Sequence, residues 1–163
     1  MKNHLVLIGF IVIFVPTVTF SQDSRFIFTD LTVMDKVTGL IWTKNANLPG
    51  KELSYKDTLD FIKKLNNQKF AVYGDWRLPD KEELKSLVDY AKGRGLLTNI
   101  HEMLNRMGFE NMEGDPGYWT ASYYTISVLN DGAWSIAMYN GYTSPLGKLG
   151  RLYVWPVREP IKQ

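Results

Sequence analysis

Residues that could act as nucleophiles or as acid–base catalysts are scarce in this chain. It contains no cysteine and two histidines, His4 and His101. No G-x-S-x-G turn supplies a serine nucleophile for His101, and zinc sites built on several His or Cys ligands are excluded by number. The stretch 141–148, GYTSPLGK, has five residues between its glycines and no Ser or Thr after the lysine, so it does not match a phosphate-binding loop. We therefore expect no catalytic activity, and we interpret 141–148 as a surface loop.

Tyrosines late in the chain, with polar neighbours, are the best candidates for ligand contact. Tyrosine offers rigid apolar area and a hydroxyl, whereas Asn, Asp and Ser offer adaptable hydrogen bonds, a mixture that suits a carbohydrate or a protein ligand. The alternative is that they are ordinary residues at loop edges. The predicted ligand-binding residues are Tyr123, Tyr124, Asn130, Asp131, Tyr139, Asn140, Tyr142 and Ser144.

The remaining aromatic and charged groups have two interpretations each. Four tryptophans in strand or hinge motifs are expected in the core: Trp42, Trp76, Trp119 and Trp155. Acidic residues at 110–115 and 130–131 offer oxygen ligands for calcium, the one cofactor considered, or are solvated loops. Basic residues at 63–64 and 81–94 either meet an acidic polymer or are solvated helix faces. A net charge of +2 gives no electrostatic reason to expect nucleic-acid binding.

The N-terminus has the pattern of a secretory signal peptide. Lys2 precedes an apolar run at 5–15, and Thr19 and Ser21 stand at −3 and −1 to a cleavage before Gln22. The alternative, an uncleaved anchor, conflicts with a run shorter than the roughly 20 residues that span a bilayer. We therefore expect residues 1–21 to be a leader, and residues 22–163 to form a single domain that is periplasmic or extracellular, with no membrane span. Without cysteine, this domain has neither a lipid anchor at its N-terminus nor a disulfide.

Local patterns predict an α+β domain. Ser54 and Asp80 are predicted helix N-caps, and Asp80 is followed three residues later by Glu83, a capping box. The helix after Ser54 is expected to bury Tyr55, Thr58, Leu59, Ile62 and Leu65. A short third helix is expected near 98–107. Strands are predicted at 26–28, 32–34, 40–43, 133–139 and 151–158, with a long loop at 140–150.

Four ordered motifs carry a family resemblance. They are DKVTGLIW at 35–42, DWRLP at 75–79 with EL and SLVD after it, YWTAS at 118–122, and YVWPVR at 153–158. Together they resemble the Lcl C-terminal domain family, named after the terminal domain of a bacterial collagen-like adhesin, over roughly residues 30–158. The resemblance implies a C-type-lectin-like fold, with two main helices beside a twisted antiparallel sheet, and a ligand-binding or adhesive role towards surface glycans or proteins.

Two other functions remain open for such a chain. It could be a structural subunit of a periplasmic or surface assembly, with its tyrosines buried against a partner. It could also be an enzyme related to the formylglycine-generating oxidases, which share the broader fold, although their active-site cysteines are missing here.

Overall fold

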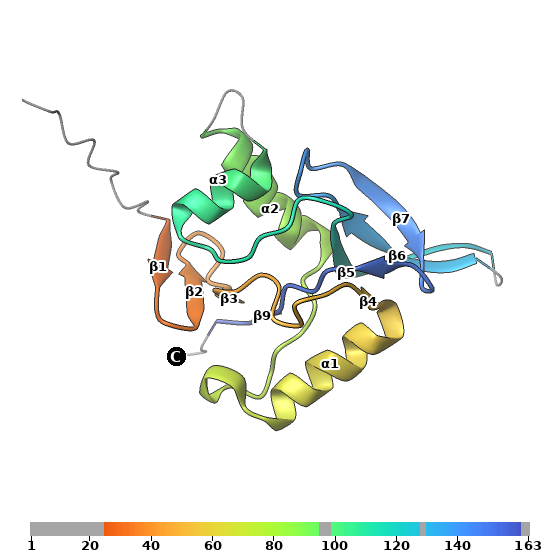
Figure 1. Ribbon diagram of the computed structural model, residues 1–163, viewed down its shortest axis with the longest axis horizontal. Coiled ribbons are helices and arrows are strands. Elements are labelled where there is room, and N and C mark those ends of the chain that lie inside the picture. Colours follow the sequence, from red (N-terminus) through yellow and green to blue (C-terminus); the bar gives the residue numbers. More distant parts are fainter. Residues whose placement is uncertain (1–24, 95–98, 128–129, 161–163) are drawn as a thin grey trace, which may run out of the picture.

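The computed structural model describes residues 25–94, 99–127 and 130–160 (Figure 1). Its helices and antiparallel strands confirm the α+β class. The predicted signal peptide at 1–21 lies outside the described residues. Within them, no helix combines the length and apolar character needed to cross a membrane.

The strands form three small sheets, where a single twisted sheet was expected. The first sheet has the order β1 (Phe26–Phe28), β2 (Thr32–Asp35), β3 (Ile41–Thr43) and β9 (Val157–Arg158), all antiparallel. The second pairs β4 (Leu53–Ser54) with β8 (Arg151–Leu152). The third has the order β5 (Tyr118–Ser127), β6 (Asn130–Ile136) and β7 (Thr143–Gly147).

Two predictions about the last third of the chain are wrong. Residues 140–150 are not one long loop, because β7 pairs along β6 from Thr143 to Gly147. Pro145 is compatible with this strand because β7 lies at the edge of its sheet, where no N–H is needed on the outer side. Residues 151–158 are not one strand either: β8 and β9 belong to different sheets, and the buried segment between them includes Pro156, which cannot donate a hydrogen bond.

The helices begin and end largely where the capping residues predict. They are α1 (Tyr55–Asn67), α2 (Lys81–Lys92) and α3 (Ile100–Met107), with a short 3-10 turn at Phe70–Val72. Asp80 accepts a 2.7 Å hydrogen bond from the backbone N–H of Glu83, whose carboxylate accepts one of 2.7 Å in return. Gly108 ends α3 with φ of +113°, a conformation that glycine adopts without strain.

The core confirms the role predicted for the four tryptophans, which are all fully buried. Trp42 and Trp155 pack with ring centroids 4.7 Å apart, between the first sheet and helices α2 and α3. Trp119 belongs to a second cluster, with residues of α1, β4 and β8, and its indole N–H donates to the carbonyl of Leu53 over 2.9 Å. In Figure 1 the first sheet and the β5–β6–β7 sheet lie on opposite sides of the molecule, and α1 runs along a third side.

Candidate functional site

A groove runs between α1 and β5. Its volume is about 360 Å³, and most of its surface is apolar. We call it the α1–β5 groove. It is lined by Tyr55, Leu59, Ile62, Arg77, Leu78, Ala121 and Tyr123.

The local sequence explains why these side chains face one another. Tyr55, Leu59 and Ile62 recur at steps of four and three, which places them on one face of α1. Ala121 and Tyr123 of β5 both line the groove, where the pairing of β5 with β6 is interrupted by a bulge between Trp119 and Tyr123. Leu59 was expected in the core, but it is 48% exposed, because it lines the open groove instead of packing into the interior.

Four polar groups meet at one end of the groove; we call them the mouth cluster: Tyr55, Tyr123, Asp131 and Lys148. The rings of Tyr55 and Tyr123 have centroids 6.3 Å apart. The ammonium of Lys148 lies 5.7 Å and 5.2 Å from those centroids and 2.5 Å from the carboxylate of Asp131. Tyr55 is buried, whereas Tyr123 is 64% exposed, so a ligand can reach the ring of Tyr123 directly.

Burial of Tyr55 changes its acidity within the mouth cluster. The pKa of Tyr55 is raised to about 12, mainly by burial, and the neighbouring phenol of Tyr123 and carboxylate of Asp131 act in the same direction. Tyr55 is therefore a neutral phenol at physiological pH and can form hydrogen bonds without exchanging its proton. An arrangement of two phenols, one carboxylate and one ammonium beside apolar surface is suited to holding a polar molecule.

The opposite end of the groove contains Arg77. Its guanidinium donates to both carboxylate oxygens of Glu83, over 2.8 Å and 2.7 Å, and also contacts Glu159. The hydrogen bonds to Glu83 are the largest cause of a raised pKa of Arg77, so this side chain stays charged. Arg77 therefore makes structural hydrogen bonds, and the same side chain forms part of the wall of the groove.

The structure does not bring the eight predicted ligand-binding residues onto one surface. Tyr123 lines the groove and Asp131 belongs to the mouth cluster. Tyr124, the next residue along β5, lies on the other face of the sheet and packs edge-on against Trp134, with centroids 5.4 Å apart. The side chain of Asn130 lies outside the described residues.

Three more of the predicted residues lie at the far end of the same sheet, where β6 turns into β7. Tyr139 stacks on His101 of α3, with centroids 6.4 Å apart. Asn140 accepts a 2.8 Å hydrogen bond from the backbone N–H of Tyr142, which closes the turn. Since Ile136 at this end pairs with Thr143, the turn is separated from Tyr123 by several strand residues. Within the sheet itself, the carbonyl of Ser144 accepts a 2.9 Å hydrogen bond from the hydroxyl of Ser135.

Most groups at the site were not predicted as ligand contacts, among them Tyr55, Leu59 and Lys148. Tyr55 and Leu59 were assigned to the buried face of a helix by their spacing. Lys148 is about ninety positions from both, and it reaches Tyr55 because it follows β7 and because its carbonyl accepts a 3.2 Å hydrogen bond from the backbone N–H of Tyr55. No local signal could have identified this lysine.

The acidic segments show no arrangement for a metal ion. Within the described residues, no three His, Asp or Glu side chains are grouped closely enough to hold one. Glu110 is paired with Lys44 over 2.7 Å, and Asp131 with Lys148. Two basic residues of α2 also have partners: Lys85 contacts Asp89, and the ammonium of Lys81 lies 4.8 Å from the ring centroid of Trp134.

Comparison with known proteins identifies the family. Residues 31–158 match the Lcl C-terminal domain, so the chain belongs to the Lcl C-terminal domain family, as the four motifs indicated. Membership suggests a non-catalytic bacterial surface domain. No curated protein matches the chain significantly.

Proposed function

We propose that this protein is an exported, non-catalytic binding module that holds a surface glycan in the α1–β5 groove. The observation that carries the proposal is the exposed ring of Tyr123, a member of the mouth cluster, at the end of an apolar groove. The volume of the groove falls within the range of about 300–1,000 Å³ that is typical of small-molecule sites.

The chemistry of the mouth cluster favours a sugar as the first ligand and a protein as the second. A pyranose ring has an apolar C–H face and a rim of hydroxyls. The ring of Tyr123 offers an apolar surface for the C–H face, while Tyr55, Asp131 and Lys148 offer hydrogen-bond donors and acceptors for the hydroxyls. A rigid body with recognition at its rim also agrees with the C-type-lectin-like fold proposed for the family. Export follows from the leader pattern at residues 1–21.

A glycan array with purified protein and two matched variants tests the proposal. We expect Tyr123→Ala to weaken binding about tenfold or more, as truncation of an aromatic anchor does in other recognition sites. Tyr142→Ala is the control, because Tyr142 is equally exposed, at 67%, but lies at the far end of the sheet. Unchanged melting temperatures would show that both variants fold.

Each alternative outcome has a distinct meaning. If Tyr142→Ala weakens binding and Tyr123→Ala does not, the glycan binds at the turn between β6 and β7. If the array shows no binding while a protein ligand is retained through Tyr123, the ligand class is wrong and the site is right.

A further inference from the structure

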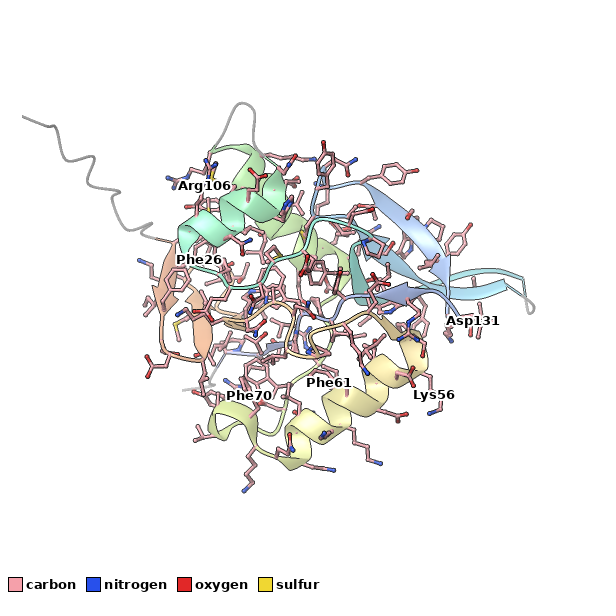
Figure 2. The ribbon with its side chains drawn as sticks, in the orientation of Figure 1. Phe26, Lys56, Phe61, Phe70, Arg106 and Asp131 are labelled. Atoms are coloured by element: carbon pink, nitrogen blue, oxygen red, sulfur yellow. The ribbon has the colours of Figure 1, made fainter. Side chains whose placement is uncertain are left out.

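The ammonium of Lys148 lies among three electron-rich groups. It is 5.7 Å from the ring centroid of Tyr55 and 5.2 Å from that of Tyr123, both within the roughly 6 Å over which a cation and an aromatic ring attract each other. The carboxylate of Asp131 contacts the same ammonium over 2.5 Å. Figure 2 shows Asp131 and Lys56, the second residue of α1, on the same side of the molecule. We call Tyr55, Tyr123 and Asp131, without Lys148, the ammonium cage.

The innermost wall of this cage is fixed, whereas the side chain inside it can leave. Tyr55 is buried, and its ring packs edge-on against Trp119 with centroids 5.2 Å apart. The backbone of Lys148 is held by the hydrogen bond from Tyr55 to its carbonyl, but its side chain is 36% exposed. The long flexible stem of a lysine can therefore carry the ammonium into solvent while the backbone stays in place.

The chemistry of the cage suits a cation and does not suit an anion. The face of a tyrosine ring carries the negative part of the ring quadrupole, and the carboxylate of Asp131 adds a full negative charge. An anion that approached Lys148 would have to displace Asp131 and would meet two electronegative ring faces. A ligand ammonium that replaces the ammonium of Lys148 leaves the charge of the cage and its occupant unchanged, so this exchange needs no further counter-charge.

The cage opens onto the α1–β5 groove, because Tyr55 and Tyr123 belong to both. Beyond these two rings, the groove presents the apolar side chains of Leu59, Ile62 and Leu78. A ligand could therefore place its body against apolar surface and its ammonium between the tyrosine rings and Asp131.

We propose that the ammonium cage recognises an organic ammonium group, which takes the place of the Lys148 ammonium. The inference rests on the proposed glycan function and specifies its ligand: a glycan with non-acetylated amino sugars, whose protonated amines supply the ammonium. Lys148 is then an internal competitor. It fills the cage in the free protein and lowers the apparent affinity by the fraction of time that the cage is occupied.

Titration with choline, followed by NMR, tests the cage separately from any glycan. Choline carries a permanent ammonium, and its uncharged carbon isostere, with a tert-butyl group in place of the trimethylammonium, has nearly the same shape. We expect choline, and not the isostere, to shift the ring resonances of Tyr123. In the same titration, the methylene protons next to the Lys148 ammonium should lose the upfield shift that the two rings produce.

Variants of Lys148 test the competition. Lys148→Ala should lower the Kd for choline about tenfold, the effect expected if the lysine occupies the cage about nine-tenths of the time. Lys148→Gln, which keeps a long polar side chain without the charge, should act in the same direction. Lys85→Ala is the matched control, because Lys85 also pairs with an aspartate, but on α2, and its Kd should equal that of the wild type.

The carboxylate of the cage is tested in the background of Lys148→Ala. Adding Asp131→Asn should raise the Kd for choline several-fold, because the cage loses its only formal charge. Melting temperatures close to that of the wild type would show that these variants fold.

Oligosaccharides of glucosamine and of N-acetylglucosamine distinguish this inference from the proposed function. At about pH 6, where such amines are protonated, we expect the glucosamine chain to bind more tightly than the acetylated one, and Tyr123→Ala to bind neither well. If both chains bind equally through Tyr123 and choline does not bind, the glycan site is right and the ammonium cage is wrong. If choline binds and neither chain does, the cage is right and the glycan is wrong.

Two results overturn the inference whatever the oligosaccharides do. One is the absence of choline binding in both the wild type and Lys148→Ala. The other is weaker binding of choline to Lys148→Ala, because Lys148 would then support the ligand instead of competing with it.

Discussion

Replacing Asp35 by Asn should reveal how strongly the N-terminal hairpin is tied to the rest of the domain. The carboxylate of Asp35 accepts from Arg25 over 2.8 Å and 2.6 Å, in a bidentate pair. It also accepts hydrogen bonds of 3.0 Å and 2.9 Å from Val37 and Thr38. The guanidinium of Arg25 reaches on to the hydroxyl of Ser86 on α2, over 2.9 Å, so the pair joins the first sheet to a helix.

The size of the effect follows from burial. Arg25 and Asp35 are 8% and 1% exposed. The substitution removes the only negative charge of the pair and leaves the guanidinium of Arg25 buried, a change that typically costs about 3 to 5 kcal/mol. Since small domains are stable by about 5 to 15 kcal/mol in total, this is a large share of the free energy of unfolding.

Urea denaturation at several pH values provides the measurement. Burial by itself would raise the pKa of Asp35, but the hydrogen bonds from Arg25 and Thr38 outweigh it and lower the pKa below 3.8. A lowered pKa stabilises the fold above the unfolded-state value and loses this effect as the pH falls through the folded-state value. The free energy of unfolding of the wild type should therefore exceed that of Asp35→Asn by a constant amount near neutral pH. This difference in free energy should shrink below about pH 3.8.

Asp60→Asn is the matched control for this experiment. Asp60 forms an ion pair with Lys56 on α1 over 2.6 Å, but both side chains are mostly exposed to water. Such pairs contribute little, so this variant should unfold almost as the wild type does. The reasoning is refuted if Asp35→Asn lowers the free energy of unfolding no more than Asp60→Asn does. It is also refuted if the effect of Asp35→Asn stays the same at acidic pH.

Two further predictions concern Asn66, which holds the backbone of Trp76, and Tyr55, which lines the α1–β5 groove. Asn66→Ala should destabilise the fold by about 1 to 3 kcal/mol, because the N–H of Trp76 loses its 2.7 Å hydrogen bond to the amide oxygen of Asn66 and the C=O of Trp76 loses the 2.8 Å bond that the amide nitrogen donates. Replacing the exposed neighbour, Asn67→Ala, should not destabilise the fold in this way. Tyr55, with its pKa raised to about 12, should contribute stability below pH 10 that is lost as the pH rises towards 12. Chemical denaturation at pH 7 and pH 11 should therefore show a smaller alkaline loss in Tyr55→Phe, and an equal loss would contradict the assigned burial.

Much of the first half of the fold could be predicted because its signals are local. Ser54 and Asp80 start their helices as predicted, and the turn between β2 and β3 contains Gly39 with φ of +76°. Strand β1 agrees with the prediction, and β2 and β3 do so to within one residue at an end. Capping and turn chemistry involve neighbours along the chain, so they are visible in the sequence.

The last third was less predictable because it depends on partners far along the chain. Gly141–Lys148 has loop-like composition, yet most of it becomes the edge strand of a sheet, since β6 supplies the hydrogen bonds. The predicted ligand-binding residues were chosen by type, and alternation along the strands sends Tyr123 and Tyr124 to opposite faces. Composition cannot tell which face of a strand will meet a helix.

The sequence by itself determined the family, the α+β class, the capped helices and the tryptophan core. These depend on spacing, on capping and on the insolubility of large apolar side chains in water. Only the tertiary structure decided that Tyr55 and Leu59 of α1 meet Tyr123 of β5, and that Lys148 lies over both tyrosine rings. These features arise from contacts between segments distant in sequence, and the free energy of such contacts is settled only when the chain packs.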